Sequence, residues 1–143
     1  MIYTQRNGQL SNNTDRALKL REVFDALQEI NKDIPVIVEG KRDAAALRKL
    51  GLVGEILTVH NGQGIYEFCE EISENFQKVI LLLDWDDKGE SLNKALCRLL
   101  NGQWEEFSAF REIIKILCQK DIKDVEGIPK LLGRLEADEA HWQ

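Results

Sequence analysis

The chain contains few of the residues that cross-link small folds or build transition-metal sites. Its 143 residues include three cysteines and two histidines, and no two cysteines form a C-x-x-C pair. A disulfide framework and a zinc knuckle are therefore not indicated, and a histidine-rich metal centre is excluded. All three cysteines lie in apolar helical patterns, which favours buried free thiols.

Long apolar segments are also missing. No stretch approaches the roughly 20 apolar residues that span a bilayer, and the N-terminus has no apolar core of the kind found in secretory signals. We therefore expect a cytoplasmic protein without membrane association. A hydrophobic content of 43% and a charged content of 31%, without repeats or low-complexity segments, are typical of one globular domain.

Basic residues are fewer than acidic residues, and the resulting net charge of −6 argues against a general nucleic-acid coat protein. A nuclease is not excluded, because carboxylates that hold metal ions are neutralised when the metal binds. Residues 41–49 are locally basic. Such a segment either contacts nucleic acid or is the solvated face of a helix.

Apolar periodicity predicts alternating strands and helices along the chain. Strands are expected at residues 34–39, 55–59, 79–83 and 104–107. Helices are expected at residues 14–32, 41–50, 65–75, 90–100, 110–119 and 129–137. The first helix is expected to be capped at residues 13–15 after a loose polar start, and residues 136–143 are expected to be frayed.

The strand at residues 79–83 is continuously apolar, which indicates that both of its faces are covered. Continuous rather than alternating apolarity favours a parallel sheet between layers of helices. The repeated alternation of strand and helix implies right-handed crossovers. We therefore predict a three-layer α/β domain.

Acidic residues follow two of the predicted strands. Glu39-Gly40 ends the first strand, and Asp84-Trp85-Asp86-Asp87-Lys88-Gly89 ends the third. In an open parallel sheet, ligands bind beyond these carboxyl ends. An extended backbone directs Asp84 and Asp86 to one side and Trp85 away, and Gly89 is expected to allow a tight turn into the next helix.

Carboxylates at the tips of buried strands cost folding energy unless a partner compensates them, most simply a metal ion. Two carboxylates joined by an oxygen from a third form a hard site suited to Mg²⁺ or Mn²⁺. Asp-rich clusters after strands are also common as loop formers and helix caps. The third-strand motif alone is therefore ambiguous, and the Glu-Gly at the neighbouring tip favours the metal site.

Together, Val38-Glu39-Gly40-Lys41-Arg42-Asp43 and Asp84-Trp85-Asp86-Asp87-Lys88-Gly89 resemble the Toprim domain. That domain occurs in type IA and type II topoisomerases, bacterial primases, recombination mediators, overcoming-lysogeny nucleases and the small ribonucleases that mature 5S ribosomal RNA. Its pattern is Glu-Gly after the first strand and D-x-D, often D-x-D-x-x-G, after the third. The chain resembles the small stand-alone Toprim proteins of archaea and some bacteria, and its E-G-K-x-D form is most similar to the RNA-maturase branch.

The resemblance implies a Rossmann-like, three-layer α/β fold with a mainly parallel four-stranded sheet. It covers about residues 34–107. We therefore expect residues 1–143 to form a single domain, with an N-terminal helix at 14–32 and a helical C-terminal extension at 108–140.

The resemblance also implies a chemistry. By position, Glu39 is the candidate general acid or base and a candidate metal-site ligand, and Asp84 and Asp86 are the candidate Mg²⁺ or Mn²⁺ ligands. Toprim domains make or break P–O bonds in phosphodiesters, where a metal stabilises charge on the phosphate oxygens. Glu39 would move a proton, aided if burial and nearby acids raise its pKa.

Five neighbours of these acids have two interpretations each. Asp43 assists the metal site or only complements the dipole at the start of its helix. Asp87 is a third metal ligand or a cap, and Lys41 and Lys88 contact phosphate or are solvated. His60 follows the second predicted strand and either touches substrate or belongs to a glycine-rich turn.

Two hypotheses on function follow from the resemblance. The first is a Mg²⁺-dependent nuclease, a hydrolase or nucleotidyl-transfer type protein that cleaves or processes nucleic acid, RNA rather than DNA. The second is a non-catalytic, metal-binding Toprim module that binds nucleic acid or a protein partner, which would supply the substrate-binding surface. The acidic residues 121–129 are expected to be a solvated loop and helix start, or alternatively to cover the site or contact a partner.

Other assignments fit less of the chain. A receiver-type signalling domain would use Asp84 as phospho-acceptor, but it requires an acidic pair after the first strand and a lysine after the last. Haloacid-dehalogenase-like phosphatases carry D-x-D on their first strand rather than their third. Tyr3 and Tyr66 belong to no topoisomerase-like nucleophile module, and no zinc-binding region like that of primases occurs, so strand passage and primer synthesis are not expected.

Overall fold

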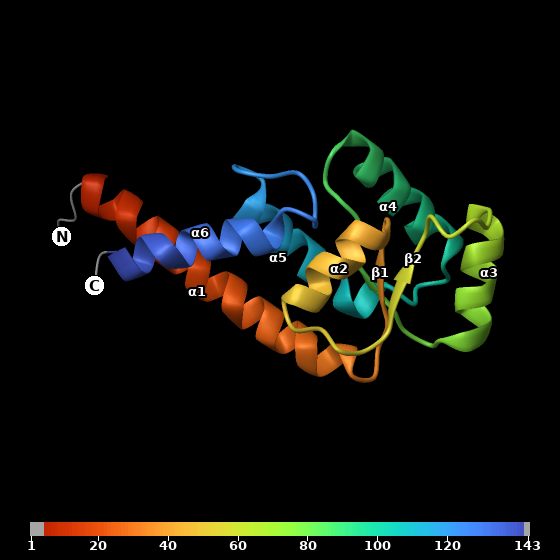
Figure 1. Cartoon of the computed structure of the whole chain (residues 1–143). Helices are drawn as coiled ribbons and strands as arrows, with labels where there is room; N and C mark the ends of the chain where they lie inside the picture. The colour runs from red at the N-terminus through yellow and green to blue at the C-terminus, as the bar shows by residue number, and fades with distance from the viewer. Residues whose placement is uncertain (1–4, 142–143) are drawn as a thin grey trace.

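The computed structural model describes residues 5–141, with side chains described for residues 12–138. Its three strands are β1 (Val36–Val38), β2 (Ile56–Thr58) and β3 (Ile80–Leu81). Its helices are α1 (Gln5–Asn31), α2 (Lys41–Lys49), α3 (Ile65–Asn75), α4 (Asp87–Leu99), the 3₁₀ turn η1 (Glu105–Phe107), α5 (Ser108–Cys118) and α6 (Ile128–His141). Figure 1 shows the sheet beside a long arm in which α1 and α6 lie together.

The sheet is parallel and has the order β2-β1-β3. Val36 of β1 lies opposite Ile56 on one side and Ile80 on the other. The central position of β1 explains its uninterrupted apolarity, since all its side chains are fully buried. The predicted α/β class and parallel sheet are confirmed.

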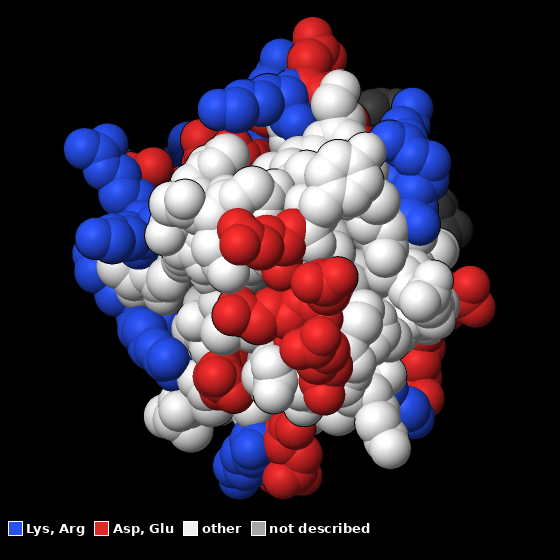
Figure 2. Space-filling model, turned by 90° about the vertical axis from the view of Figure 1, so that its right-hand side faces the viewer, with Lys and Arg blue, Asp and Glu red and all other residues white. Residues whose placement is uncertain are grey.

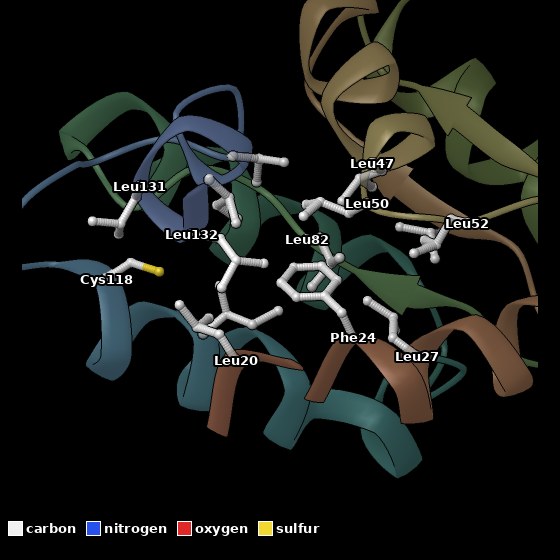
Figure 3. Close-up of a cluster of buried hydrophobic side chains, with 14 of the residues drawn as sticks. Leu20, Phe24, Leu27, Leu47, Leu50, Leu52, Leu82, Cys118, Leu131 and Leu132 are labelled. Carbon is white, nitrogen blue, oxygen red and sulfur yellow. The ribbon is translucent and has the colours of Figure 1, made fainter. Parts of the chain in front are cut away.

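Alternate strand residues point to opposite faces of the sheet, as the period of a β-strand requires. Val36 and Ile80 belong to one buried cluster, whereas Ile37 and Leu81 belong to the other. Helices α1, α2, α5 and α6 contribute to the first cluster, and α3 and α4 contribute to the second. Figure 3 shows side chains of α1, α2 and α6 pointing toward one another around Leu82 in the first cluster.

The predicted fourth strand at residues 104–107 is wrong, because residues 105–107 form the turn η1 and the sheet has three strands. The carbonyl of Gln103 accepts a 3.0 Å hydrogen bond from the N–H of Val79, so the chain touches the outer edge of β3 for one residue. Trp104 then turns inward and donates a 3.1 Å hydrogen bond from Nε1 to the carbonyl of Cys97. The packing of Trp104 against α4 therefore outweighs the β propensity of the aromatic residues in this segment.

The predicted loose start is also wrong for the part that the structure describes. Helix α1 begins at Gln5, so residues 5–13 are helical and no cap lies at residues 13–15; residues 1–4 lie outside the described range. Helix α6 lies alongside α1 and continues to His141, beyond the expected start of fraying, with residues 142–143 outside the described range. Tertiary contact between the two helices supports helix where composition alone favours turns. Within residues 5–141, no helix combines the length and apolarity needed to cross a bilayer.

Candidate functional site

The carboxyl ends of the strands meet at one edge of the sheet. Glu39 directly follows β1, and its carbonyl accepts a 3.1 Å hydrogen bond from the N–H of His60, which follows β2. On the other side, the N–H of Leu82 donates a 2.9 Å hydrogen bond to the carbonyl of Ile37, which carries the β1–β3 pairing toward Asp84. The structure therefore brings Glu39, His60 and Asp84 to the edge where the sequence predicts a site.

The Glu39 carboxylate is largely enclosed, with 12% of the side chain exposed. Its Oε2 lies 3.8 Å from Nε2 of His60 and 4.0 Å from Nζ of Lys88. Its Oε1 is buried and has no hydrogen-bond partner among the described residues. Because a buried carboxylate oxygen without a partner costs roughly several kcal/mol, this atom favours a cation or a hydrogen-bond donor beside it.

Asp84 is buried, and its Oδ1 accepts a 2.8 Å hydrogen bond from the N–H of Val125. Burial raises the pKa of its carboxyl to about 7, against the lowering effect of the Val125 hydrogen bond. The negative charges of Asp43, Glu39 and Asp124 raise this pKa further. Asp84 is therefore partly protonated near neutral pH when no cation compensates the negative charge at this edge of the sheet.

Asp43 lies in the first turn of α2, and its role at a metal site stays a prediction. Its Oδ2 accepts a 3.1 Å hydrogen bond from the N–H of Gly40, so it holds the first turn of α2. It is also buried, and burial raises its pKa, as do the charges of Glu39, Glu126 and Asp124. The coupling to Glu39 places the Asp43 carboxylate near the acids at the strand tips.

Asp86 and Asp87 occupy the start of α4. Asp86 is the N-cap of that helix, and its Oδ1 accepts a 2.7 Å hydrogen bond from the N–H of Gly89. Asp87, like Lys41 and Lys88, is exposed. Within the part of the chain that the structure describes, no three acidic, histidine or cysteine side chains converge as a preformed metal-ligand group. The roles of these residues in metal or phosphate binding stay predictions.

Gly89 has a different role from the expected tight turn. It lies inside the first turn of α4, and it is absent from the glycines with positive φ. A Cβ at this position would lie 2.1 Å from the carbonyl oxygen of Asp84. Glycine is therefore needed because the helix packs directly on the backbone of the strand tip, which is a spatial requirement and not a torsional one.

Arg111 of α5 is a residue of the site that the sequence analysis missed. Only 5% of it is exposed. Its Nε donates a 2.8 Å hydrogen bond to the carbonyl of Leu83, and its Nη2 donates a 2.6 Å hydrogen bond to the carbonyl of Asp84. Arg111 shares an apolar helix face with Ile114 and Cys118, and a lone arginine on such a face was the available signal.

The segment between α5 and α6 closes over the same strand tip. The N–H of Trp85 donates a 3.0 Å hydrogen bond to the carbonyl of Lys123, and Nε1 of Trp85 donates a 2.8 Å bond to the carbonyl of Ile122. With the Val125 contact to Asp84, three hydrogen bonds tie residues 122–125 to the site. The predicted loop and helix start are confirmed, since α6 begins at Ile128, and the loop is in addition hydrogen-bonded to the strand tip.

The donors at this edge fit Mg²⁺ in kind. They are hard carboxylate oxygens, and one of them, Oε1 of Glu39, is buried without a partner among the described residues. Mg²⁺ is commonly bound through one or two carboxylates and several waters, so a preformed group of three ligands is not required. Burial and, to a smaller extent, the neighbouring acids raise the pKa of Asp84, so a bound cation would favour its ionised form.

Comparison with known proteins places the chain in a family. The Toprim domain model matches residues 35–116, a range that contains both strand-tip motifs and most of α5. The solved structure of a putative protein from Aquifex aeolicus is similar with a TM-score of 0.60 and 26% identity, covering 75% of this chain and 95% of that chain. The chain belongs to the Toprim domain family.

Archaeal relatives are similar over half of the chain or more. A UPF0292 protein of Methanosarcina barkeri is 32% identical over 84% of this chain and 85% of its own length. A UPF0292 protein of Pyrococcus abyssi is 35% identical over 79% and 83%, and one of Thermoplasma volcanium is 44% identical over 50% of this chain and 60% of that protein. Toprim domains typically bind Mg²⁺ and are associated with nucleic acid. These relatives carry no maturase name, so the maturase branch stays a prediction.

Proposed function

We propose that this chain is a Mg²⁺-dependent phosphodiesterase that cleaves or processes nucleic acid, RNA rather than DNA, in the cytoplasm. The observation that carries the proposal is the pairing of Glu39 and Asp84 at the ends of the adjacent strands β1 and β3. Both side chains are largely enclosed, and each is influenced by further acids or cations at the same edge. Family membership supports a phosphodiester substrate, and the E-G-K-x-D form supports RNA.

Each residue has a distinct role in this proposal. Glu39 moves a proton to or from a reacting oxygen, with His60 and Lys88 positioned beside its Oε2. Asp84, Asp86 and Glu39 would hold the cation, and only one carboxylate oxygen of Asp86 is used to cap α4. When bound, Mg²⁺ would stabilise negative charge on the phosphate oxygens. Arg111 and residues 122–125 fix the Asp84 backbone and carboxylate in place.

The surface of α2 offers a route for a phosphate backbone to this edge. Arg42 and Lys49 of α2 line a hollow of about 380 Å³ together with Lys130 of α6. Lys41 continues the positive charge to the first residue of α2, next to Glu39-Gly40. Phosphate binding by such clusters is electrostatic and sequence-independent, so this surface would position nucleic acid without reading its sequence.

The test is cleavage of a labelled RNA stem-loop and of its DNA equivalent on denaturing gels, with Mg²⁺ or with chelator. Wild-type protein should cut RNA with Mg²⁺ only, and Glu39→Gln and Asp84→Asn should each lower the rate by roughly 10²-fold or more. Glu67→Gln, an exposed acid on α3, is the matched control and should cleave like wild type. Equal cleavage by Glu39→Gln and wild type would contradict the proposed catalytic role of Glu39.

A second candidate is a non-catalytic Toprim module that binds metal and a partner. It is favoured by the use of Asp86 as the α4 cap and by the lack of three converging ligands among the described residues. Metal binding at Glu39 and Asp84 without cleavage of any RNA or DNA substrate would support this candidate over the phosphodiesterase.

A further inference from the structure

Strand β2 is an open edge of the sheet, whereas the opposite edge is covered. Beyond β3, Gln103, Arg111 and Lys123 make hydrogen bonds to the chain between Val79 and Trp85. Among the residues that the structure describes, strand β2 pairs with β1 alone. An uncovered edge strand presents unpaired backbone groups that form a template for another strand.

The backbone groups on the outer side of β2 are those of alternate residues. The carbonyl of Glu55 and the N–H of Val59 bond to β1, accepting from Val36 and donating to Val38 over 3.0 Å in each case. Because successive residues of a strand direct these groups to opposite sides, the N–H and carbonyl of Ile56 and Thr58 face away from β1. They are placed to pair with an added strand.

A groove of about 650 Å³ runs along this edge. Its walls are β2 and α3, and its apolar lining comes from Ile56, Leu57, Phe68, Ile72 and Phe76. An added strand would direct every second side chain into this lining and the others toward solvent. Asn61 lines the groove next to His60, so the groove reaches the edge that carries Glu39.

The charge around the groove selects its occupant. Helix α3 carries exposed glutamates and no lysine or arginine; they are Glu67, Glu70, Glu71 and Glu74. Glu55 and Glu71 line the groove itself. Figure 2 shows acidic side chains gathered at the centre of the side that α3 occupies, with basic ones at the margins. Like charges across an interface cost several kcal/mol, so this surface disfavours nucleic acid and a second copy of the chain.

We propose that the groove along β2 binds an extended, lysine- or arginine-rich segment of a protein partner, which adds to the sheet beside β2. The apolar lining takes alternate aliphatic side chains of that segment, and the glutamates of α3 pair with its basic side chains. The partner would be held beside the strand-tip site and would add the positive charge that this acidic chain lacks. The proposal does not depend on the chain being a nuclease.

The probe is a capped octapeptide of alternating lysine and valine, with alternating glutamate and valine as its control. The peptide is titrated into the full ¹⁵N-labelled chain, and amide shifts and hydrogen exchange are recorded. We expect saturable shifts and slower exchange centred on Ile56 and Thr58, with the glutamate peptide inactive. Shifts centred elsewhere, or none at millimolar peptide, would overturn the proposal.

Charge reversal on the exposed face of α3 tests whether its glutamates select a basic partner segment. The double variant Glu71→Lys/Glu74→Lys should bind the lysine peptide at least tenfold more weakly, and Glu112→Lys on α5 should bind it like wild type. Equal binding by the α3 variant would contradict the assignment of a basic occupant. Two other results would overturn the proposal by showing a different occupant of the groove. One is a concentration-dependent dimer whose β2 amides are protected from exchange, and the other is an RNA oligonucleotide that shifts the same amides.

Discussion

The N–H of Val125 donates a 2.8 Å hydrogen bond to Oδ1 of Asp84, which joins two points of the chain 41 residues apart. It is the hydrogen bond that opposes the burial-driven rise of the Asp84 pKa. The C-terminal extension therefore acts on the electrostatics of the strand tip directly. Without the Val125 hydrogen bond, the pKa of Asp84 would be raised further.

Asp84→Asn should change the pH dependence of stability. The folded pKa of Asp84 is raised to about 7 by burial, above the value of 3.8 in an unfolded chain. The folded state therefore binds the extra proton between these values, and stability is lost as pH rises, by at most about 1.4 kcal/mol per pH unit. In chelator, the asparagine variant should be more stable than wild type at pH 8 and equal near pH 3.5 by urea denaturation. A constant difference at all pH values would show that Asp84 does not titrate in this range.

Arg111→Met should destabilise the fold by about 3 kcal/mol. The substitution leaves the carbonyls of Leu83 and Asp84 without their buried donor and removes the 3.1 Å ion pair with Glu90. Arg111→Lys should recover less than half of the loss, because an ammonium group lacks the planar fork that bridges two carbonyls. Urea denaturation measures both variants. A lysine variant as stable as wild type would show that only the charge matters.

Gly89→Ala and Gly133→Ala should have opposite effects, although both glycines are helical. A Cβ on Gly89 would lie 2.1 Å from the backbone oxygen of Asp84, which cannot move aside, and the variant should lose 2 kcal/mol or more, roughly. A Cβ on Gly133 meets none of the described atoms within 4 Å, so alanine there should add about 0.5–1 kcal/mol of stability. Thermal unfolding of the pair decides whether close packing on the strand tip explains Gly89.

Trp85→Phe should loosen the segment between α5 and α6. It removes the Nε1 donor to the carbonyl of Ile122, at a cost of about 1 kcal/mol. The Val125 amide should then exchange faster with solvent, because the segment that carries it is less well held. Trp104→Phe removes a similar hydrogen bond, to the carbonyl of Cys97, on the other side of the sheet. Its loss of stability should be comparable, with the exchange of the Val125 amide changed no more than global stability requires.

The strand tips were predictable because their signals are local. A continuously apolar run that stops at Asp84 indicates a strand buried on both faces, and parallel strands must place their carboxyl ends together. Helix ranges inside the core were predicted to within about three residues for the same reason. The start of α1 and the end of α6 were not, because these helices depend on packing against each other rather than on their own composition.

The remaining parts of the site depend on contacts between distant segments. Nothing local to Arg111 shows that its guanidinium reaches the carbonyls of Leu83 and Asp84, and nothing local to Val125 shows that its N–H reaches a carboxylate. The predicted fourth strand was wrong for the same reason, because Trp104 donates its hydrogen bond to α4 instead of extending the sheet. Sequence patterns report burial and period, and they do not report which buried groups pair.

The central claim, that Glu39 and Asp84 share one cation site, is tested most directly by Mn²⁺ titration of the ¹⁵N-labelled chain. Paramagnetic broadening should appear first at amides of residues 39–41, 84–86 and 125, and Mg²⁺ should compete it away. In Asp84→Asn and Glu39→Gln the same broadening should need at least tenfold more Mn²⁺. Broadening confined to the glutamates of α3, or unchanged in both variants, would contradict the claim.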